Sequence, residues 1–354
     1  MLPLYWRLVT DSMADWLRIP WEIGCGFHAR ARCGNLGILR GPRRRGTAFP
    51  LRGGAATGRG QAGGAIVGMK TPGPEAAPRA AGAAETGDAP VRAVLFDLDG
   101  TLLELDMARF LPVYLQRLAS YVADLFEPED FVHQLMRATA AVIGNRDRSR
   151  TNERVLYDTF WSGLDPDRHP GARPERRAEA MARFDRFYRT EFGRLRHLAR
   201  PRPEASRVVA AARARGCKVV LATSPVFPRV AIEERLRWAG LDAGQFDLVT
   251  TLENMHTCKP QPDYYYEVAA RVGVEPVHCL MVGNDLRDDI APAARAGMRV
   301  YVVEGLVVNE DEPGAPRAPR GSLGQLLAWM ERPAPLGNIF ANRATLHGNS
   351  AGLQ

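Results

Sequence analysis

The 354-residue sequence contains few cysteines, and none of them stands at a spacing typical of metal or redox sites. No two form a CxxC pair, and three lie in or beside apolar segments. A disulfide-held domain or a zinc ribbon needs more cysteines at paired spacings. The sequence therefore argues against a disulfide framework and against a cysteine zinc site. The cysteines are Cys25, Cys33, Cys217, Cys258 and Cys279.

Long hydrophobic runs are also missing. No apolar run reaches the ~18 residues that a membrane-spanning helix requires. The apolar piece at residues 1–21 carries Asp11 and Asp15, so it lacks the charged-then-apolar layout of a secretory signal. With its cysteines in apolar, reduced surroundings, the chain is expected to be cytoplasmic and to have no membrane partner.

Excess positive charge is confined to the first ninety residues. The formal net charge is +7, but residues 1–90 hold 12 basic and 6 acidic residues, whereas the remainder holds 35 and 34. A nucleic-acid-binding domain carries a basic stripe that follows the phosphate backbone. The nearly neutral remainder offers no such stripe, so we expect no nucleic-acid partner.

Residues 1–90 also differ from the rest in composition, because they hold 16 of the 34 glycines among many alanines, arginines and prolines. Such a segment buries too little apolar area to offset its ordering entropy, which predicts a disordered basic tail. Two alternatives stay open. One is an organelle presequence, favoured by the arginines and opposed by the early acids; the other is a translation start at Met69. Residues 332–354 are predicted to form a flexible tail.

Two stretches, 91–105 and 197–331, alternate apolar runs with amphipathic segments. This alternation predicts an α/β fold with a doubly wound parallel sheet. Between them, residues 106–196 place apolar residues at threes and fours and show no strand pattern, which predicts an inserted all-helical domain. Gly216 follows one helical segment at a position that favours a left-handed C-cap. The first predicted strand is the apolar run that starts at Ala93 and ends in the carboxylates of Asp97 and Asp99. The other predicted strands are 217–225, 246–250, 279–283 and 299–303.

Polar and charged residues that could bind a ligand or act in catalysis follow four of these strands. Carboxyl ends of parallel strands share one edge of a sheet and bind ligands there, so we expect these side chains to converge. Clustered carboxylates suit a hard divalent cation such as Mg²⁺, and the lack of His and Cys among them argues against zinc. The residues are Asp97, Asp99, Thr223, Ser224, Lys259, Asn284, Asp285 and Asp289.

A metal ion, an ammonium and a hydroxyl around one carboxylate form a cradle for a phosphoryl group. In that cradle Asp97 can attack phosphorus and form an aspartyl-phosphate. A second acid two residues along a strand points to the same side. Asp99 can therefore protonate the leaving oxygen and later deprotonate water.

The four motifs in this order resemble the haloacid dehalogenase (HAD) superfamily of phosphohydrolases. The resemblance covers about residues 93–305, and the inserted helices look like the mobile helical cap of that family. Asp97-Leu98-Asp99-Gly100-Thr101-Leu102 looks like its first motif, Thr223 like its second, Lys259-Pro260 like its third, and Gly283 to Asp289 like its fourth.

This resemblance implies a role for each residue. Asp97 would be the nucleophile and a Mg²⁺ ligand, and Asp99 the general acid and base, with its backbone carbonyl on the metal. Thr223, with Ser224, would bind the phosphoryl oxygens, and Lys259 would pair with both Asp97 and the phosphate. Dehalogenating members resemble this pattern but lack the second acid, so Asp99 favours a phosphatase.

The fourth motif departs from the family pattern, which commonly opens Gly-Asp. Here Asn284 is neutral, so Asp285 is the predicted Mg²⁺ carboxylate. Asn284 and Asp289 are expected just behind the ligands, where Asp289 would orient Lys259 or a metal-bound water.

These features predict a Mg²⁺-dependent phosphatase that acts on a small phosphorylated molecule. Two alternatives stay open: a phosphomutase with the same acids, and a non-catalytic binding protein on the same fold. In the predicted cap, Arg146 and Asn152 are candidates for substrate contact. Neither the substrate nor the oligomeric state follows from the pattern.

Overall fold

The computed structural model describes residues 89–333, so the predicted tails 1–90 and 332–354 lie outside it except for two residues each. Within that range six strands form one parallel sheet in the order β5-β4-β1-β6-β7-β8, which confirms the predicted doubly wound architecture. The strands are β1 (Ala93–Phe96), β4 (Lys218–Leu221), β5 (Leu248–Val249), β6 (Cys279–Gly283), β7 (Arg299–Val303) and β8 (Arg320–Gly321).

Strand β1 lies in the middle of the sheet. Its first residue, Ala93, pairs with Lys218 of β4 on one side and with Cys279 of β6 on the other. All four residues of β1 are apolar and fully buried, as expected for a strand covered on both faces. The residues that follow β1 therefore leave the centre of the sheet at its carboxyl edge.

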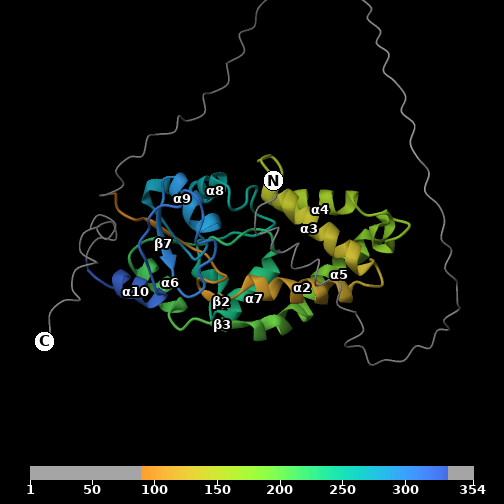
Figure 1. Ribbon diagram of the computed structural model, residues 1–354, viewed down its shortest axis with the longest axis horizontal. Helices are drawn as coiled ribbons and strands as arrows, with labels where there is room; N and C mark the ends of the chain where they lie inside the picture. The colour runs from red at the N-terminus through yellow and green to blue at the C-terminus, as the bar shows by residue number, and fades with distance from the viewer. Residues whose placement is uncertain (1–88, 334–354) are drawn as a thin grey trace, which may run out of the picture. The chain divides into compact units, whose positions relative to one another are not determined.

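Helices cover both faces of the sheet. They are α6 (Ala205–Ala214), α7 (Arg229–Trp238), α8 (Pro262–Val272), α9 (Ala291–Arg295) and α10 (Leu323–Met330), with short turns at Ala243–Gln245, Pro276–His278 and Leu286–Ile290. Because successive strand residues point to opposite faces, Val94 and Phe96 share a core with α6, α7 and α10. Ala93 and Leu95 share another core with α8 and α9. Figure 1 shows these two helix layers on either side of β7.

The inserted segment folds into helices, as its periodicity predicts. They lie on the side away from β7 (Figure 1), and their apolar faces meet in a cluster of aromatic rings, with Phe126, Phe131, Phe160 and Phe184 in mutual contact. We refer to these helices as the cap. They are α2 (Met107–Tyr121), α3 (Pro128–Gly144), α4 (Asn152–Ser162) and α5 (Arg177–Thr190), with short helical turns at Pro170–Ala172, Pro174–Arg176 and Phe192–Leu198.

Two short strands flank the cap, and the sequence pattern predicts neither. β2 (Leu103–Leu105) and β3 (Ala199–Pro201) pair antiparallel, with Leu103 opposite Pro201. They lie on the two chain segments that join the cap to the sheet domain. This ribbon ties both connections together at the base of the cap.

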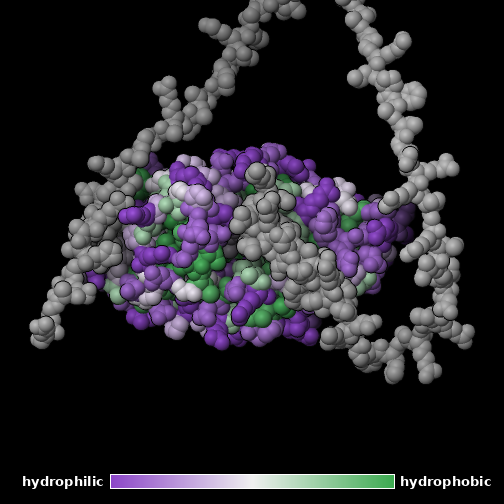
Figure 2. Space-filling model, viewed as in Figure 1, coloured by the Kyte–Doolittle hydropathy of each residue, from purple (hydrophilic) through white to green (hydrophobic). Residues whose placement is uncertain are grey.

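Nearly all large apolar side chains of the described region are used in these cores. Those that remain exposed among residues 89–333 are Tyr266 and Val308. The face visible in Figure 2 is mostly hydrophilic, with hydrophobic residues in smaller patches. No helix in this part of the chain is both long and apolar enough to cross a membrane.

Candidate active site

The loop after β1 is fixed against the loop after β6. Gly100 has a φ of +89°, and a Cβ at this position would lie 2.2 Å from the Asn284 Nδ2 atom. The Thr101 hydroxyl donates to Asn284 Oδ1 at 3.0 Å, and Asn284 Nδ2 donates to the Leu306 carbonyl. Only glycine suits both the left-handed backbone and the close approach. Asn284 thus holds the loop that carries Asp97 and Asp99.

Lys259 lies between two carboxylates. Its Nζ donates to Asp97 Oδ1 at 2.9 Å and to Asp289 Oδ1 at 2.6 Å, and the side chain is buried. Burial lowers the pKa of Lys259, but the charges of Asp289 and Asp97 outweigh it and hold that pKa well above its usual value. These two carboxylates therefore favour the charged form of the ammonium, and Asp289 orients it.

Asp99 pairs with a residue that sequence reasoning missed. Arg235 of α7, only 1% exposed, donates through a guanidinium nitrogen to Asp99 Oδ2 and stacks on the Phe227 ring at 4.4 Å. Burial raises the pKa of Asp99 to about 6, Arg235 opposes the shift and Asp97 adds to it. The other oxygen, Oδ1, has no hydrogen-bond partner among the described residues. The signal in the sequence is the register of Arg235, one turn after Ala231 on the apolar face of α7.

Asp285 begins the turn that follows β6. Its Oδ1 accepts the backbone N–H groups of Arg287 and Asp288 at 2.9 and 3.0 Å, and Asn309 Nδ2 donates to the same oxygen at 2.8 Å. Burial and the neighbouring Asp288 raise the pKa of Asp285 to about 6. Asp289 Oδ2 accepts the backbone N–H of Asp285 at 3.1 Å, so the whole turn has a defined conformation.

Thr223 and Ser224 follow β4 and line the same cavity as Asp97 and Lys259. The Thr223 carbonyl accepts hydrogen bonds from the Thr250 hydroxyl at 2.7 Å and from the Tyr264 hydroxyl at 3.0 Å. These buried contacts fix the backbone after β4. The side chains of the two residues line the cavity into which Asp97 and Lys259 also face.

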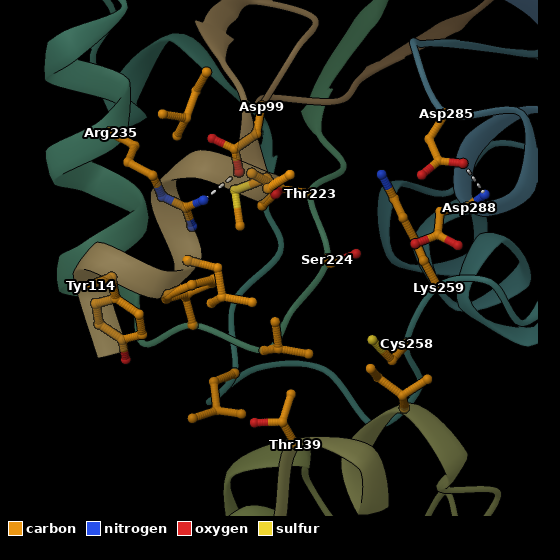
Figure 3. A pocket seen from close by; sticks show the side chains of 18 of the residues that line it. Asp99, Tyr114, Thr139, Thr223, Ser224, Arg235, Cys258, Lys259, Asp285 and Asp288 are labelled. Carbon is orange, nitrogen blue, oxygen red and sulfur yellow. Dashed lines mark hydrogen bonds and ion pairs between the residues drawn. The ribbon is translucent and has the colours of Figure 1, made fainter. Parts of the chain in front are cut away.

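One cavity of about 720 Å³ connects these residues with the cap. Figure 3 shows Asp99 and Arg235 on one side of it, Lys259 and Asp285 on the other, and Thr139 of α3 across from them. The convergence expected from the strand ends is therefore present for every predicted residue of the sheet domain. Those residues are Asp97, Asp99, Thr223, Ser224, Lys259, Asn284, Asp285 and Asp289.

The two predicted cap contacts lie elsewhere. Asn152 begins α4 fully buried, and its Nδ2 donates to the Thr257 carbonyl at 3.0 Å while its backbone N–H donates to the Met255 carbonyl at 2.7 Å. Arg146 is exposed and donates to the neighbouring Asn145 carbonyl. Neither residue lines the cavity. Asn152 instead joins the cap to the loop that carries Lys259.

The donor set fits a magnesium ion. Among residues 89–333 no group of three His, Cys, Asp or Glu side chains is arranged to hold a metal by itself. Mg²⁺ commonly takes one or two carboxylates and completes its shell with water and phosphate oxygens. Asp97 and Asp285 supply such a pair, and carboxylates outnumber cations among the lining residues. Mg²⁺ would relieve this excess negative charge.

Comparisons with known proteins identify the family of the chain. Residues 91–297 match the family model described as haloacid dehalogenase-like hydrolase. The chain is 26% identical over 219 residues to YhcW of Bacillus subtilis (strain 168), covering 62% of this chain and 86% of that protein. It is 24% identical over 213 residues to pyrophosphatase PpaX of Bacillus cereus (strain AH820), covering 60% and 83%.

Among solved structures, the HAD phosphatase from Thermococcus onnurineus superposes with a TM-score of 0.42 at 20% identity, covering 68% of this chain and 98% of that one. The family model spans more than half of the sequence and contains all four strand-end motifs. The chain therefore belongs to the haloacid dehalogenase-like hydrolases.

Proposed function

We propose that the protein is a Mg²⁺-dependent phosphohydrolase that cleaves phosphate monoesters through an aspartyl-phosphate on Asp97. One observation carries this proposal: a buried ammonium, Lys259, contacts Asp97 and Asp289, with Asp99 two residues along the chain facing the same cavity. A cation fixed beside a carboxylate offers positive charge to an incoming phosphoryl group.

In the first step an Asp97 oxygen attacks phosphorus, and the bond from phosphorus to the ester oxygen breaks. Asp99 donates its proton to the departing oxygen, and the alcohol leaves. The raised pKa of Asp99, about 6, suits this task because a useful fraction is protonated near neutral pH. We assign the proton transfer to Oδ1, which is buried and has no hydrogen-bond partner among the described residues, because Oδ2 accepts from Arg235.

In the second step Asp99 removes a proton from water, the water oxygen attacks phosphorus, and the bond to Asp97 breaks. Phosphate is released and both aspartates return to their starting states. Lys259 and the Thr223 hydroxyl would contact the phosphoryl oxygens throughout. When bound, Mg²⁺ would supply further positive charge there, held by Asp97, Asp285 and the Asp99 carbonyl.

The test measures phosphate release from para-nitrophenyl phosphate by the purified full chain with Mg²⁺. Inorganic pyrophosphate is assayed beside it, because the relative PpaX is named a pyrophosphatase. Asp97→Asn should abolish turnover, whereas Asp158→Asn, the same change at an exposed ion pair on α4, should leave it unchanged. Acid quenching should trap one phosphoryl group on the peptide that contains Asp97. Full activity in Asp97→Asn refutes the mechanism, and isomerisation without phosphate release identifies a mutase instead.

A further inference from the structure

The cavity continues well beyond the phosphoryl site, and its far part is apolar. All four cap helices contribute aliphatic and aromatic side chains to the lining, and several of these are only half-buried although they lie on the inner faces of their helices. Figure 3 shows the depth of this space between Lys259 and Thr139. Representative lining residues are Leu111 and Leu115 of α2, Leu135 and Met136 of α3, and Leu156 and Tyr157 of α4.

Three hydroxyl groups in this part of the lining already form hydrogen bonds within the cap. The Thr139 hydroxyl donates to the Leu135 carbonyl one turn earlier at 2.9 Å. The Tyr114 and Tyr188 hydroxyls lie 2.7 Å apart and bond to each other. A sugar placed here would lose water from its hydroxyls and gain few partners in return, which is costly.

Every cation that lines the cavity is matched to a carboxylate. Lys259 lies between Asp97 and Asp289, as described above. Arg235 pairs with Asp99, and Arg287 Nε donates to Asp288 at 2.7 Å. The lining residues that the cap supplies include no lysine or arginine.

The arginines in the loop after α3 lie outside the lining. There Arg148 pairs with Asp263, and Arg150 pairs with Asp158. The cap therefore offers no counter-charge to a second anionic group on the substrate.

From these three features we infer that the substrate is a phosphate monoester of a bulky, neutral, apolar alcohol, whose hydrocarbon part occupies the cap half of the cavity. The inference rests on the proposed phosphatase function and names its substrate class. A cavity of about 720 Å³ lies within the size range of sites for drug-sized ligands, which is far more space than a short polar ester needs. Each methylene moved from water into this lining should strengthen binding about fourfold.

The experiment compares n-alkyl monophosphates from ethyl to decyl with glycerol phosphate and glucose 6-phosphate. Phosphate release by the full chain with Mg²⁺ gives kcat/KM for each ester. We expect kcat/KM to rise by up to about fourfold per methylene until the cavity is filled, with glycerol phosphate below propyl phosphate. A flat or falling series, or preference for either polar ester, overturns the inference while leaving the phosphatase function intact.

Binding of n-alkylphosphonates, which have no hydrolysable ester bond, separates the two proposals. Calorimetry should show affinity rising with chain length and a heat capacity change that becomes more negative. If no ester is hydrolysed, the phosphatase proposal fails, and this series still decides the cavity's preference. Affinity independent of chain length overturns the inference.

A substitution within α3 tests where the hydrocarbon part of the substrate lies in the cavity. Leu135→Gln should reduce the ratio of decyl to ethyl turnover by tenfold or more, because it puts an amide against the hydrocarbon. Arg137→Gln, two residues along the same helix but exposed and outside the lining, should leave the ratio unchanged. An unchanged ratio in Leu135→Gln contradicts the placement of the hydrocarbon.

Discussion

Replacement of Lys259 by methionine tests the electrostatic centre of the site. The side chain is 3% exposed, and its ammonium lies 2.9 Å from Asp97 and 2.6 Å from Asp289. Methionine has a similar length and no charge, so the substitution removes the cation with little change in volume. Two buried carboxylates then face each other with no neutralising group. We expect phosphatase activity to be lost and the free energy of unfolding to fall by about 3–5 kcal/mol.

The loss in the free energy of unfolding of Lys259→Met should increase as pH rises. Burial already raises the pKa of Asp289 well above its usual value, and Lys259 is what opposes that shift. A carboxyl whose pKa is raised by folding stabilises the native state while it is protonated. That stability is fully present below its unfolded-state pKa of about 3.9 and disappears as pH rises through the folded-state value. The deficit of Lys259→Met relative to wild type should therefore grow as pH rises through the raised pKa of Asp289.

Urea unfolding followed by circular dichroism measures this difference. The matched control is Lys218→Met, because Lys218 pairs with Asp247 at 3.1 Å but its side chain is 53% exposed. An exposed pair contributes about 0–1 kcal/mol, so the control should change little at any pH.

Adding Asp289→Asn to Lys259→Met should recover about half of the loss, because it removes one uncompensated charge. The amide oxygen that Asp289→Asn introduces can still accept hydrogen bonds from the backbone N–H groups of Asn284 and Asp285. A loss in Lys259→Met no larger than that in Lys218→Met would contradict this prediction, and so would further destabilisation by the second substitution.

Two further predictions concern the loop after β1 and the metal. Gly100→Ala should lower the free energy of unfolding by about 3 kcal/mol, because it adds a clash with Asn284 to the penalty of a left-handed alanine. Gly273→Ala is the control, because Gly273 is also left-handed but a Cβ there would meet open space. It should cost only about 1–2 kcal/mol in the same urea assay. Removing divalent ions with a chelator should abolish phosphate release, and adding back Mg²⁺ should restore it, because carboxylates outnumber cations in the cavity. Equal losses at both glycines, or full activity after chelation, would contradict these expectations.

The sheet domain could be predicted from the sequence because its signals are local and redundant. Apolar runs mark buried parallel strands, and β1 is indeed buried along its whole length. Gly216 ends a helix where a left-handed residue is favoured and has a φ of +75°. Convergence of Asp97, Thr223 and Lys259 then follows from topology alone, because parallel strands end at one edge.

Features that depend on pairing between distant segments of the chain cannot be predicted from the local sequence pattern. β2 and β3 are three residues each, too short for an alternating pattern, and they form only because the ends of the cap come together. Arg235 stands among charged neighbours on α7, and only its register on the apolar face of that helix distinguishes it from exposed Arg237. Its partner is Asp99, 136 positions earlier in the chain.

The cap shows most clearly why substrate choice is harder to predict than reaction type. Helical periodicity correctly identifies inward-facing residues, but an inward-facing side chain can either fill a core or border a cavity. Phe187 and Leu135 carry the same periodic signal, yet Phe187 packs among aromatic rings while Leu135 is half-buried and lines the cavity. Because anionic substrates need cations, the charged loop after α3 makes Arg146 a candidate for substrate contact. In the structure, the cap helices instead present apolar faces to the phosphoryl site. The chemistry is specified by a few residues at strand ends, but the substrate is specified by the volume that several helices leave unfilled, and that volume exists only in three dimensions.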